Sequence, residues 1–492
     1  MSHVAGVVLA LLLFFVYALA LRMIWRSPGR AFGILVAGMA VHNIVLMLLL
    51  RLGTPGIVVR IVQSWKEAIL LFLLLLTGRF GLAAWRAGRQ PRLRGLDILM
   101  AAFTLLVLFY FILPSGLLGG HVSLSQRLLG MRVLLLLPLL YLFGRVFFSP
   151  SRADLRWNLG LIAGAAAFVG LVGFIELWFI PTRAWLDAGV NQFSAWLGFK
   201  YHGPRGLPEN FFQLAAPGLY LRRMVSTYVS PLPIAYTGLL VVPLAVGLVL
   251  AKAVSRRGAV LRVALLVLTI TGMLLSITRL ALLLLVGEFA LLTILWRRRW
   301  LIVATPVVAV LVAGVLFGYP RIGPLVTADL QPVEHRGSVK IISSNDPSLN
   351  EHSATLAYDV QYVIQHPFGA GLGVSIHRFG EAQGTGESAM FDVFGEVGFV
   401  GGLLYLAMYA LILVYGLRGW HRTRRDPLLA TVPVVCLIGA LALAPITVTS
   451  DVYSDFSITF LLWWAAGFAV SLTASGQLAD LDEAPRPRRA TA

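Results

Sequence analysis

Two side chains in the segment 319–389, His352 and Glu387, are candidates for acid–base chemistry. A hydroxyl group has a high pKa, so a reaction that uses it as a nucleophile needs a positioned carboxylate or imidazole as a base. We expect a helix from about Ser353 to Gln365, directly after His352, while Glu387 borders the next long apolar run. The sequence leaves open which of the two is the base.

Two further histidines, His366 and His377, lie in the same segment. His366 precedes Pro367 and is interpreted as a helix-terminal residue, because a residue before proline disfavours the helical conformation. Between the two histidines, Gly371 and Gly373 allow the backbone to approach another group closely. We treat His377, Gly371 and Gly373 as candidates for positioning a substrate. The histidine spacing does not match a metal-ligand pattern, so no metal or other cofactor is expected.

Three arginines are candidates for binding an anion. Arg222 and Arg223 precede an apolar run, and Arg279 lies between two apolar runs. A cation at membrane depth is costly, so it usually faces a cavity or a partner. A guanidinium makes bidentate hydrogen bonds to phosphate oxygens and stays charged at any working pH. We therefore expect Arg223 and Arg279, together with Arg222, to clamp an anionic group at the outer membrane surface. Snorkelling to the membrane interface is the alternative for Arg222 and Arg223.

Acidic residues occur in two pairs with helical spacing. Asp392 and Glu396 are four residues apart at the start of an apolar run and would share one helix face. Because like charges repel, we expect one of them to pair with an arginine or to take up a proton. Glu396 and Ser388 are further candidates for positioning the substrate. Asp451 and Asp455 repeat the spacing, and there we expect solvated carboxylates.

The elements that position these residues must be membrane-spanning helices. Of the 492 residues, 58% are hydrophobic and 13% are charged, and the mean hydropathy is +0.84. Soluble domains are about one quarter charged. The expected fold is therefore an all-α, polytopic helical membrane protein with about 12 to 13 spans. The lone cysteine, Cys436, excludes an intramolecular disulfide and a cysteine metal cluster.

Apolar runs of sufficient length predict where the spans lie. We place them at 4–21, 31–50, 61–83, 95–113, 131–148, 158–180, 231–250, 262–277, 280–296, 301–318, 390–416, 428–446 and 458–474. The expected divisions are N-terminal spans (1–180), a loop (181–230), central spans (231–318), a large, partly helical loop (319–389), C-terminal spans (390–474) and a disordered tail (475–492).

The charge of the connections predicts the orientation. Clusters of arginine or lysine follow each odd-numbered span, so these connections are expected on the cytoplasmic side. The loops 181–230 and 319–389 are then external, and the tail is cytoplasmic. The net charge of +18 resides mostly in these short clusters and not in a basic stripe, so nucleic-acid binding is not expected. The sequence also lacks a nucleotide-binding glycine motif.

Three segments, in order, resemble the O-antigen polymerase and O-antigen ligase superfamily of bacterial envelope enzymes. The first resembles an arginine-containing stretch that leads into a span, and the second a Ser-Arg-small motif between two spans. The third resembles a Pro-Gly-x-Gly-x-Gly segment that closes the large loop, with an E-x-G-x-x-G entry to the next span. The three segments, in this order, are RMVSTYVSPLPIAYTGLLVVPLA, SITRLALLLL, and HPFGAGLG with the following GESAMFDVFGEVGFVGGLL. Together they cover roughly residues 205–415.

The resemblance implies a multi-pass protein of the bacterial cytoplasmic (inner) membrane, with its active site on the periplasmic or extracellular side. Members of the superfamily transfer a glycan from an undecaprenyl diphosphate carrier to an acceptor without a nucleotide donor. Ligases typically have His-Asn or His-Ser where this chain has Glu387-Ser388, and an arginine near the place of His352. The chain is therefore more similar to the polymerase-like members, although the superfamily more often has twelve spans.

The resulting expectation is a glycosyltransferase that polymerises a surface polysaccharide, an O-antigen or an exopolysaccharide. Its substrate would be an undecaprenyl diphosphate-linked oligosaccharide, and the resemblance implies that Arg223, Arg279 and Arg222 bind its diphosphate. A chain-length regulator and a flippase are expected partners. A ligase or oligosaccharyl transferase remains an alternative, as does a transporter or flippase of a lipid-linked or anionic solute. A transporter is typically built with mid-bilayer charges and short loops. Here the charges gather at span boundaries and one loop has about 70 residues, which favours an enzyme.

Overall fold

The computed structural model describes residues 2–88, 92–148, 151–199, 203–253, 255–333, 347–376 and 384–474. Within these ranges, thirteen helices are long and apolar enough to cross a membrane, one for each predicted span. The expected all-α polytopic fold is thereby confirmed. His377 and the tail 475–492 lie outside the described residues.

Six of these helices belong to the N-terminal third of the chain. They are α1 (Ser2–Arg26), α2 (Ala31–Arg51), α4 (Trp65–Arg86), α5 (Gly95–Ile112), α6 (Leu124–Val146) and α7 (Arg152–Phe179). The central four are α10 (Pro231–Leu250), α11 (Arg256–Ser276), α12 (Arg279–Trp296) and α13 (Arg299–Ile322). The C-terminal spans are α15 (Ala389–Thr423), α16 (Pro427–Val434) continued through a π-helical turn by α17 (Ala440–Thr449), and α18 (Phe456–Ala474).

The core lies around α18 and α10. Of the residues in the apolar membrane-spanning segment, 94% are buried in α18 and 83% in α10, whereas only 11% are buried in α1. Trp463 and Trp464 of α18 are among the largest fully buried side chains. Such burial explains why α18 is apolar on all sides, as expected for a helix surrounded by other helices.

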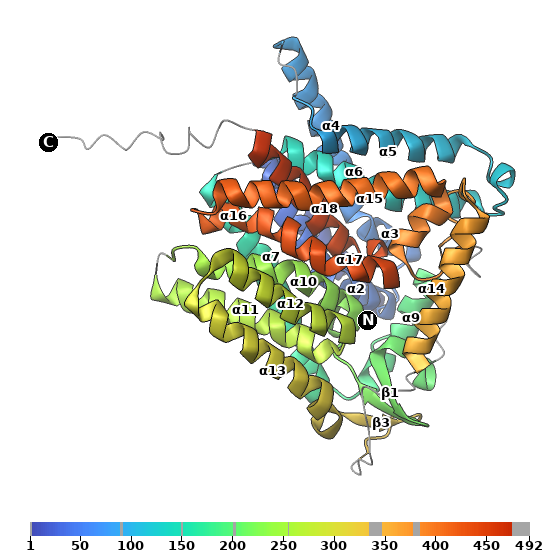
Figure 1. Ribbon diagram of the computed structural model, residues 1–492. Helices are drawn as coiled ribbons and strands as arrows, with labels where there is room; N and C mark the ends of the chain where they lie inside the picture. Colours follow the sequence, from blue (N-terminus) through green and yellow to red (C-terminus); the bar gives the residue numbers. More distant parts are fainter. Residues whose placement is uncertain are drawn as a thin grey trace.

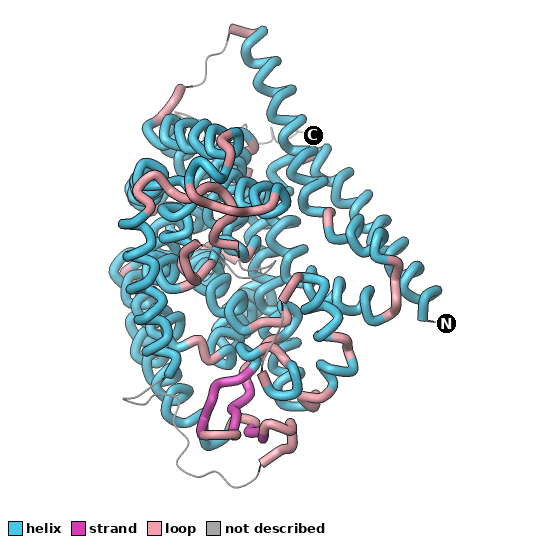
Figure 2. The backbone as a smooth tube through the Cα atoms, turned by 90° about the vertical axis from the view of Figure 1, so that its right-hand side faces the viewer, coloured by secondary structure: helices cyan, strands magenta, loops and turns pink. Residues whose placement is uncertain are grey.

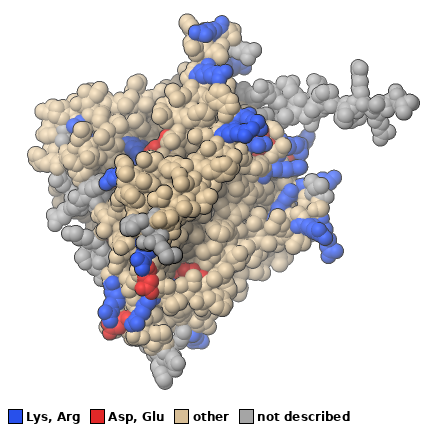
Figure 3. All heavy atoms as spheres, turned by 180° about the vertical axis from the view of Figure 1, so that it is seen from behind, with Lys and Arg blue, Asp and Glu red and all other residues tan. Residues whose placement is uncertain are grey.

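The outer helices expose apolar side chains around the bundle. Leu105 of α5 is 68% exposed and Val310 of α13 is 70% exposed. Figure 3 shows a broad surface without charged side chains, with lysine and arginine gathered towards its edges. In a bilayer, such a surface faces the hydrocarbon core, where apolar side chains carry no desolvation cost.

One end of the bundle, which we term the loop face, carries both long connections. It is where α7, α11 and α13 end and where α12, α15 and α18 begin. The first long connection contains α8 (Ala184–Asp187), α9 (Val190–Leu197), β1 (Phe212–Ala216) and β2 (Leu219–Arg222). The second contains β3 (Leu325–Thr327), which pairs with β2 in an antiparallel sheet of order β1-β2-β3. The two loops are thus joined at one edge of the molecule (Figure 2).

The second long connection also contains α14 (Pro347–Gln365). This helix ends at the predicted residue and begins six residues earlier than predicted. It packs against α15 and α17 and lies crosswise to the spans in Figure 1. Asp359 of α14 is 1% exposed although the helix lies outside the spans. Its burial brings the loop helix onto the ends of the C-terminal spans.

Candidate functional site

Arg223 and Arg279 lie close together at the loop face. Arg223 is 9% exposed, and it donates from Nε to the carbonyl oxygen of Ser276 at 2.8 Å and from Nη2 to Thr278 Oγ1 at 2.9 Å. Burial lowers the pKa of Arg223 to about 10, and the charge of Arg279 acts in the same direction, whereas Tyr236 opposes it. A pKa near 10 leaves the guanidinium protonated at neutral pH, so two positive charges adjoin here.

The turn between α11 and α12 presents these arginines. Ile277 ends α11 with a φ of +50°, a left-handed conformation that is rare for a β-branched residue. Thr278 precedes α12 without a side-chain cap, since its hydroxyl accepts hydrogen bonds from Arg223 and Ser276. The first-turn N–H groups of α12 therefore have no side-chain cap, and Arg279 is the first residue of that helix. A helix N-terminus beside two guanidinium groups favours an anion.

Arg222 lies in a different environment from its neighbour. It forms a buried ion pair with Glu176 of α7 and donates from Nη1 to the carbonyl oxygen of Ile180 at 2.6 Å. Glu176 also accepts from Trp185 Nε1 at 2.9 Å. These contacts tie the sheet to the end of α7. They favour a structural role for Arg222, and we do not include it in the anion site.

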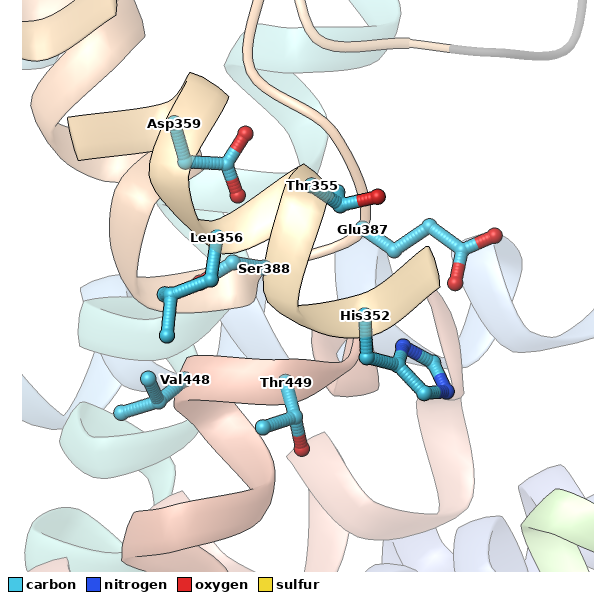
Figure 4. Close-up of a pocket in the computed structure, with 8 residues that line it drawn as sticks. All are labelled: His352, Thr355, Leu356, Asp359, Glu387, Ser388, Val448 and Thr449. Atoms are coloured by element: carbon cyan, nitrogen blue, oxygen red, sulfur yellow. The ribbon is translucent and has the colours of Figure 1, made fainter. Parts of the chain in front are cut away.

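His352 and Glu387, separated by 35 residues in the sequence, line the same pocket. It is bounded by α14, the residues before α15 and the end of α17, and its lining is His352, Thr355, Leu356, Asp359, Glu387, Ser388, Val448 and Thr449. Figure 4 shows the imidazole of His352 and the carboxylate of Glu387 directed towards the same side. Both residues are exposed. The pocket is small and partly open to solvent, with room for a group the size of a hydroxyl and not for a whole glycan.

Three contacts hold the segment that carries Glu387. Asp359 accepts a hydrogen bond from the backbone N–H of Gly386. Ser388 caps α15 by accepting from the N–H of Phe391 at 3.1 Å, and it donates to the carbonyl oxygen of Thr447 at 3.1 Å. Glu387 is therefore fixed on both sides along the chain, while its own side chain remains accessible. Ser388 positions the site through these backbone contacts.

The glycine-rich segment packs into a kink of α15. The helix is interrupted at Val397 and Gly398, and Gly371 donates its N–H to the carbonyl oxygen of Glu396 at 3.1 Å. Gly373 has a φ of +86°, and a Cβ there would lie 2.3 Å from the carbonyl oxygen of Gln126 in α6. Only glycine fits between α6 and α15 at this place. Gly371 and Gly373 thus position the loop on the bundle.

Neither Asp392 nor Glu396 forms an ion pair among the described residues. Of the two alternatives that we expected, pairing with an arginine is therefore not seen there, and the uptake of a proton stays a prediction. Asp392 Oδ1 accepts from Thr385 Oγ1. Glu396 is 4% exposed and accepts from the backbone N–H groups of Gly373 and Ser375. Glu396 therefore holds the glycine-rich segment in place.

Asp451 and Asp455 are partly buried, although we expected them to be solvated. Asp451 accepts from the N–H and the hydroxyl of Ser454, and Asp455 accepts from the N–H of Ser457 at 3.0 Å. Burial, together with the charge of Asp451, raises the pKa of Asp455 to about 7 despite the hydrogen bonds from Ser457. These carboxylates shape the turn between α17 and α18.

Tyr236 links the arginine pair to the pocket. Its hydroxyl lies 3.1 Å from Ser450 Oγ, and the charges of both Arg223 and Glu387 act on it. The backbone carbonyl of Ser450 in turn accepts from Ala389 at the start of α15. A cation, Arg223, and an accessible carboxylate, Glu387, therefore lie near the same buried tyrosine. Arginines of this kind can hold an anionic group, and a nearby carboxylate can remove a proton.

The structure thus brings together four of the predicted site residues, Arg223, Arg279, His352 and Glu387. His366 directly follows α14 and stacks on Tyr362, with ring centroids 4.3 Å apart. Sequence reasoning missed Tyr236, Thr278 and Asp359. Asp359 had a recognisable signal, a single acid among the apolar positions of a loop helix. A tyrosine and a threonine near span ends carry no such signal.

No protein-family model matches the chain, and no curated protein matches it.

Proposed function

We propose that this chain is a membrane glycosyltransferase that polymerises a bacterial surface polysaccharide. The donor would be a glycan on an undecaprenyl diphosphate carrier, and the acceptor would be a sugar hydroxyl of a lipid-linked repeat unit. The observation that carries the proposal is that Arg223 is hydrogen-bonded to the turn that precedes Arg279, while His352 and Glu387 line one pocket at the same face of the bundle. It supports one site with a cationic half and a basic half, which this reaction requires.

In the proposed reaction, the acceptor oxygen attacks the anomeric carbon of the donor glycan. The bond between that carbon and the phosphate oxygen breaks, and undecaprenyl diphosphate leaves with the electron pair. Arg223, Arg279 and the N-terminus of α12 stabilise the charge that develops on the diphosphate, as preorganised donors do in other transfer reactions. The arginines supply this charge, so the proposed reaction does not use a metal.

The proton of the acceptor hydroxyl passes to a base in the pocket. Glu387 is the first candidate, because its carboxylate is accessible and its backbone is fixed by Gly386 and Ser388. His352 is the second candidate and lines the same pocket. If Glu387 is the base, we expect His352 to bind or protonate a phosphate oxygen. If His352 is the base, Glu387 orients the acceptor.

The orientation of the site follows from the charge of the connections. Arginine clusters such as Arg297–Arg299 and Arg422–Arg425 lie at the end of the bundle opposite the loop face. The positive-inside rule places such clusters in the cytoplasm. The proposed site therefore faces the periplasm or the exterior of a bacterial inner membrane, where a lipid-linked glycan is presented after it is flipped.

The test is reconstitution of the purified protein with a synthetic undecaprenyl diphosphate-linked repeat unit and no nucleotide. We expect a ladder of products that differ by one repeat unit, and its loss in Arg223→Ala and Arg279→Ala. Lysine at either position is expected to restore little activity, because it does not make the bidentate contact. A single transfer to lipid A-core or protein would identify a ligase, and normal ladders from both lysine variants would exclude this diphosphate site.

A further inference from the structure

The surface of α14 changes in character along the helix. Its first turns expose Glu351 and His352, whereas in the range 354–368 no exposed residue is acidic or basic. The carboxylic acid in that range, Asp359, is 1% exposed, and the imidazole of His366 is half-buried and stacks on a tyrosine ring. The second half of the helix therefore presents only uncharged side chains.

The end of α14 exposes two large apolar side chains. Ile364, in the last turn, is 66% exposed, and Phe368, three residues after the helix, is 76% exposed. We term these two residues the α14 tip. Single exposed apolar residues are common on protein surfaces, so the neighbours of the α14 tip decide whether it belongs to a larger patch.

The α14 tip adjoins two membrane-spanning helices. Tyr110 of α5 donates a hydrogen bond from its hydroxyl to the carbonyl oxygen of Phe368 at 2.6 Å. The N–H of Phe399 in α15 donates to the carbonyl oxygen of Pro367 at 2.9 Å. The segment that carries Phe368 is thus attached to both spans.

Both spans expose apolar side chains beside these contacts. In α5, Phe109 is 56% exposed and Ile112 is 79% exposed, and in α15, Val400 is 63% exposed. Since these residues belong to membrane-spanning helices, their exposed side chains face lipid. The lipid-facing surface of the spans therefore continues onto the α14 tip as one apolar patch. Any other molecule that covered the tip would have to displace lipid from the adjoining spans.

The same contacts give the depth of the α14 tip. Tyr110 lies two residues before the end of α5, about 3 Å along the helix axis. Phe399 directly follows the kink of α15, and the part of α15 after the kink is longer than the roughly 20 residues that cross a bilayer. Both spans thus reach the hydrocarbon boundary near Phe368. Because α14 runs crosswise to the spans in Figure 1, it lies along the membrane surface.

The other end of α14 lies over protein. His352 and Leu356 line the pocket together with Val448 of α17, so the first turns of the helix rest on the bundle. The exposed side chains of Glu351 and His352 are polar, as expected for a surface in contact with water. The two ends of one helix therefore suit two different surroundings.

We infer that Ile364 and Phe368 insert into the lipid leaflet at the loop face, so that α14 is an interfacial helix anchored in the bilayer by its C-terminal end. The molecule that covers the α14 tip is bilayer lipid. An interfacial helix lies in the plane of the membrane surface with its apolar side chains among the acyl chains. This anchoring holds the helix that carries His352 at the height of the membrane surface. The inference does not depend on the proposed function, because it rests on exposure and contacts alone.

The first experiment uses the unmodified chain. The purified protein is reconstituted in vesicles that contain a phospholipid with a photoreactive diazirine in its acyl chain. After illumination and digestion, lipid adducts are located by mass spectrometry. We expect adducts at Ile364 or Phe368 and at Val400, and none at Ser353 in the first half of α14. Adducts on the spans without any at Ile364 and Phe368 would overturn the inference.

The second experiment measures the surroundings of the α14 tip. With Cys436 replaced, single cysteines at Ile364, Phe368, Val400 and Ser353 carry a nitroxide label. Collisions with oxygen, which concentrates in lipid, are compared with collisions with a water-soluble nickel chelate. We expect the labels at the α14 tip to resemble the label at Val400, and the label at Ser353 to be accessible to nickel. Nickel accessibility at the tip equal to that at Ser353 would place the tip in water and overturn the inference.

The double variant Ile364→Gln, Phe368→Gln tests whether the apolar side chains cause the anchoring. It is expected to lose the lipid adducts in α14 and to keep those at Val400, whereas the matched control Ser353→Gln keeps both. Unchanged adducts in the double variant would contradict the inference, and the unmodified chain decides should this variant fail to fold. Mutual broadening of Phe368 labels without contact with oxygen would show that a second copy of the chain covers the tip, which would also overturn it.

Discussion

Arg223 donates a hydrogen bond to Thr278 across 55 residues of sequence, and this contact joins the segment after β2 to the turn before α12. The two guanidinium groups of Arg223 and Arg279 repel each other, so their proximity requires attachment to the same piece of backbone. The carbonyl of Ser276 and the hydroxyl of Thr278 provide that attachment. This arrangement costs repulsion between two adjoining cations in a low-dielectric site, and a bound diphosphate would offset that repulsion.

Removing the Thr278 hydroxyl is expected to weaken the site without removing a charge. Thr278→Ala loses one hydrogen bond to a charged group, which contributes about 1.5–3 kcal/mol. We expect the donor KM to rise about tenfold or more in a steady-state transfer assay. Thr271→Ala is the control, because Thr271 is exposed on α11 and bonds only its own helix, at Val267. Equal KM values for the two variants would contradict this role.

Glu387→Gln tests the assignment of the base. Glutamine keeps the shape and hydrogen bonding of the side chain but removes its basicity, so the transfer rate is expected to fall by ~10²–10⁴-fold. Carrier binding is expected to stay intact, since Glu387 does not bind the diphosphate. His352→Gln is expected to weaken carrier binding more than turnover. A Glu387→Gln enzyme that builds a normal polymer ladder at a similar rate would leave His352 as the base.

Arg222 is expected to contribute to stability rather than to binding. Removing one partner of a buried ion pair leaves the other charge uncompensated, at a cost of about 3–5 kcal/mol. Arg222→Met is thus expected to lower the unfolding temperature in detergent clearly, without a change in the donor KM of the folded fraction. Arg183→Met, an exposed arginine of the same loop, is the control with little expected change. A stable Arg222→Met protein with a raised donor KM would return Arg222 to the anion site.

Stability is expected to depend on pH through Asp455. Its pKa is about 7 in the folded protein, because burial and the charge of Asp451 disfavour ionisation, against an ordinary value of 3.8. The folded state therefore binds a proton that the unfolded state has lost, and stability falls as the pH rises from about 4 to 7. Asp455→Asn is expected to flatten this decline when unfolding temperatures are compared at pH 5 and 8. The exposed residue Asp329 provides the control, Asp329→Asn, which should leave the decline as it is.

The orientation can be tested with single cysteines once Cys436 is replaced. Ser353→Cys in α14 is expected to react with an impermeant thiol reagent in intact spheroplasts, because the loop face is proposed to be external. Arg257→Cys, exposed at the start of α11, is expected to react only after permeabilisation. The opposite pattern of labelling would reverse the orientation and move the proposed site to the cytoplasm.

The thirteen spans and their alternation were predictable from the sequence because the bilayer imposes a one-dimensional rule. A helix must be apolar over the thickness of the hydrocarbon core, and this requirement is read from neighbouring residues alone. The end of α14 before Pro367 was predictable for a similar local reason. Alternation of the spans also assigns Arg223, Arg279 and Glu387 to one face, although it does not say which of them meet.

What the tertiary structure decided is the partner of each polar side chain. Arg222 and Arg223 are adjacent in the sequence, yet one pairs with Glu176 of α7 and the other with the turn before α12. The glycine-rich segment has a composition typical of a ligand loop, but its carbonyl and N–H partners lie in the kink of α15. Likewise, Lys66 of α4 and Arg132 of α6 meet at two shared neighbours, Glu67 and the ring of Phe456 at the start of α18. Hydropathy is a sum over local composition, whereas a hydrogen bond or an ion pair depends on how distant helices pack, and short-range sequence does not encode that packing.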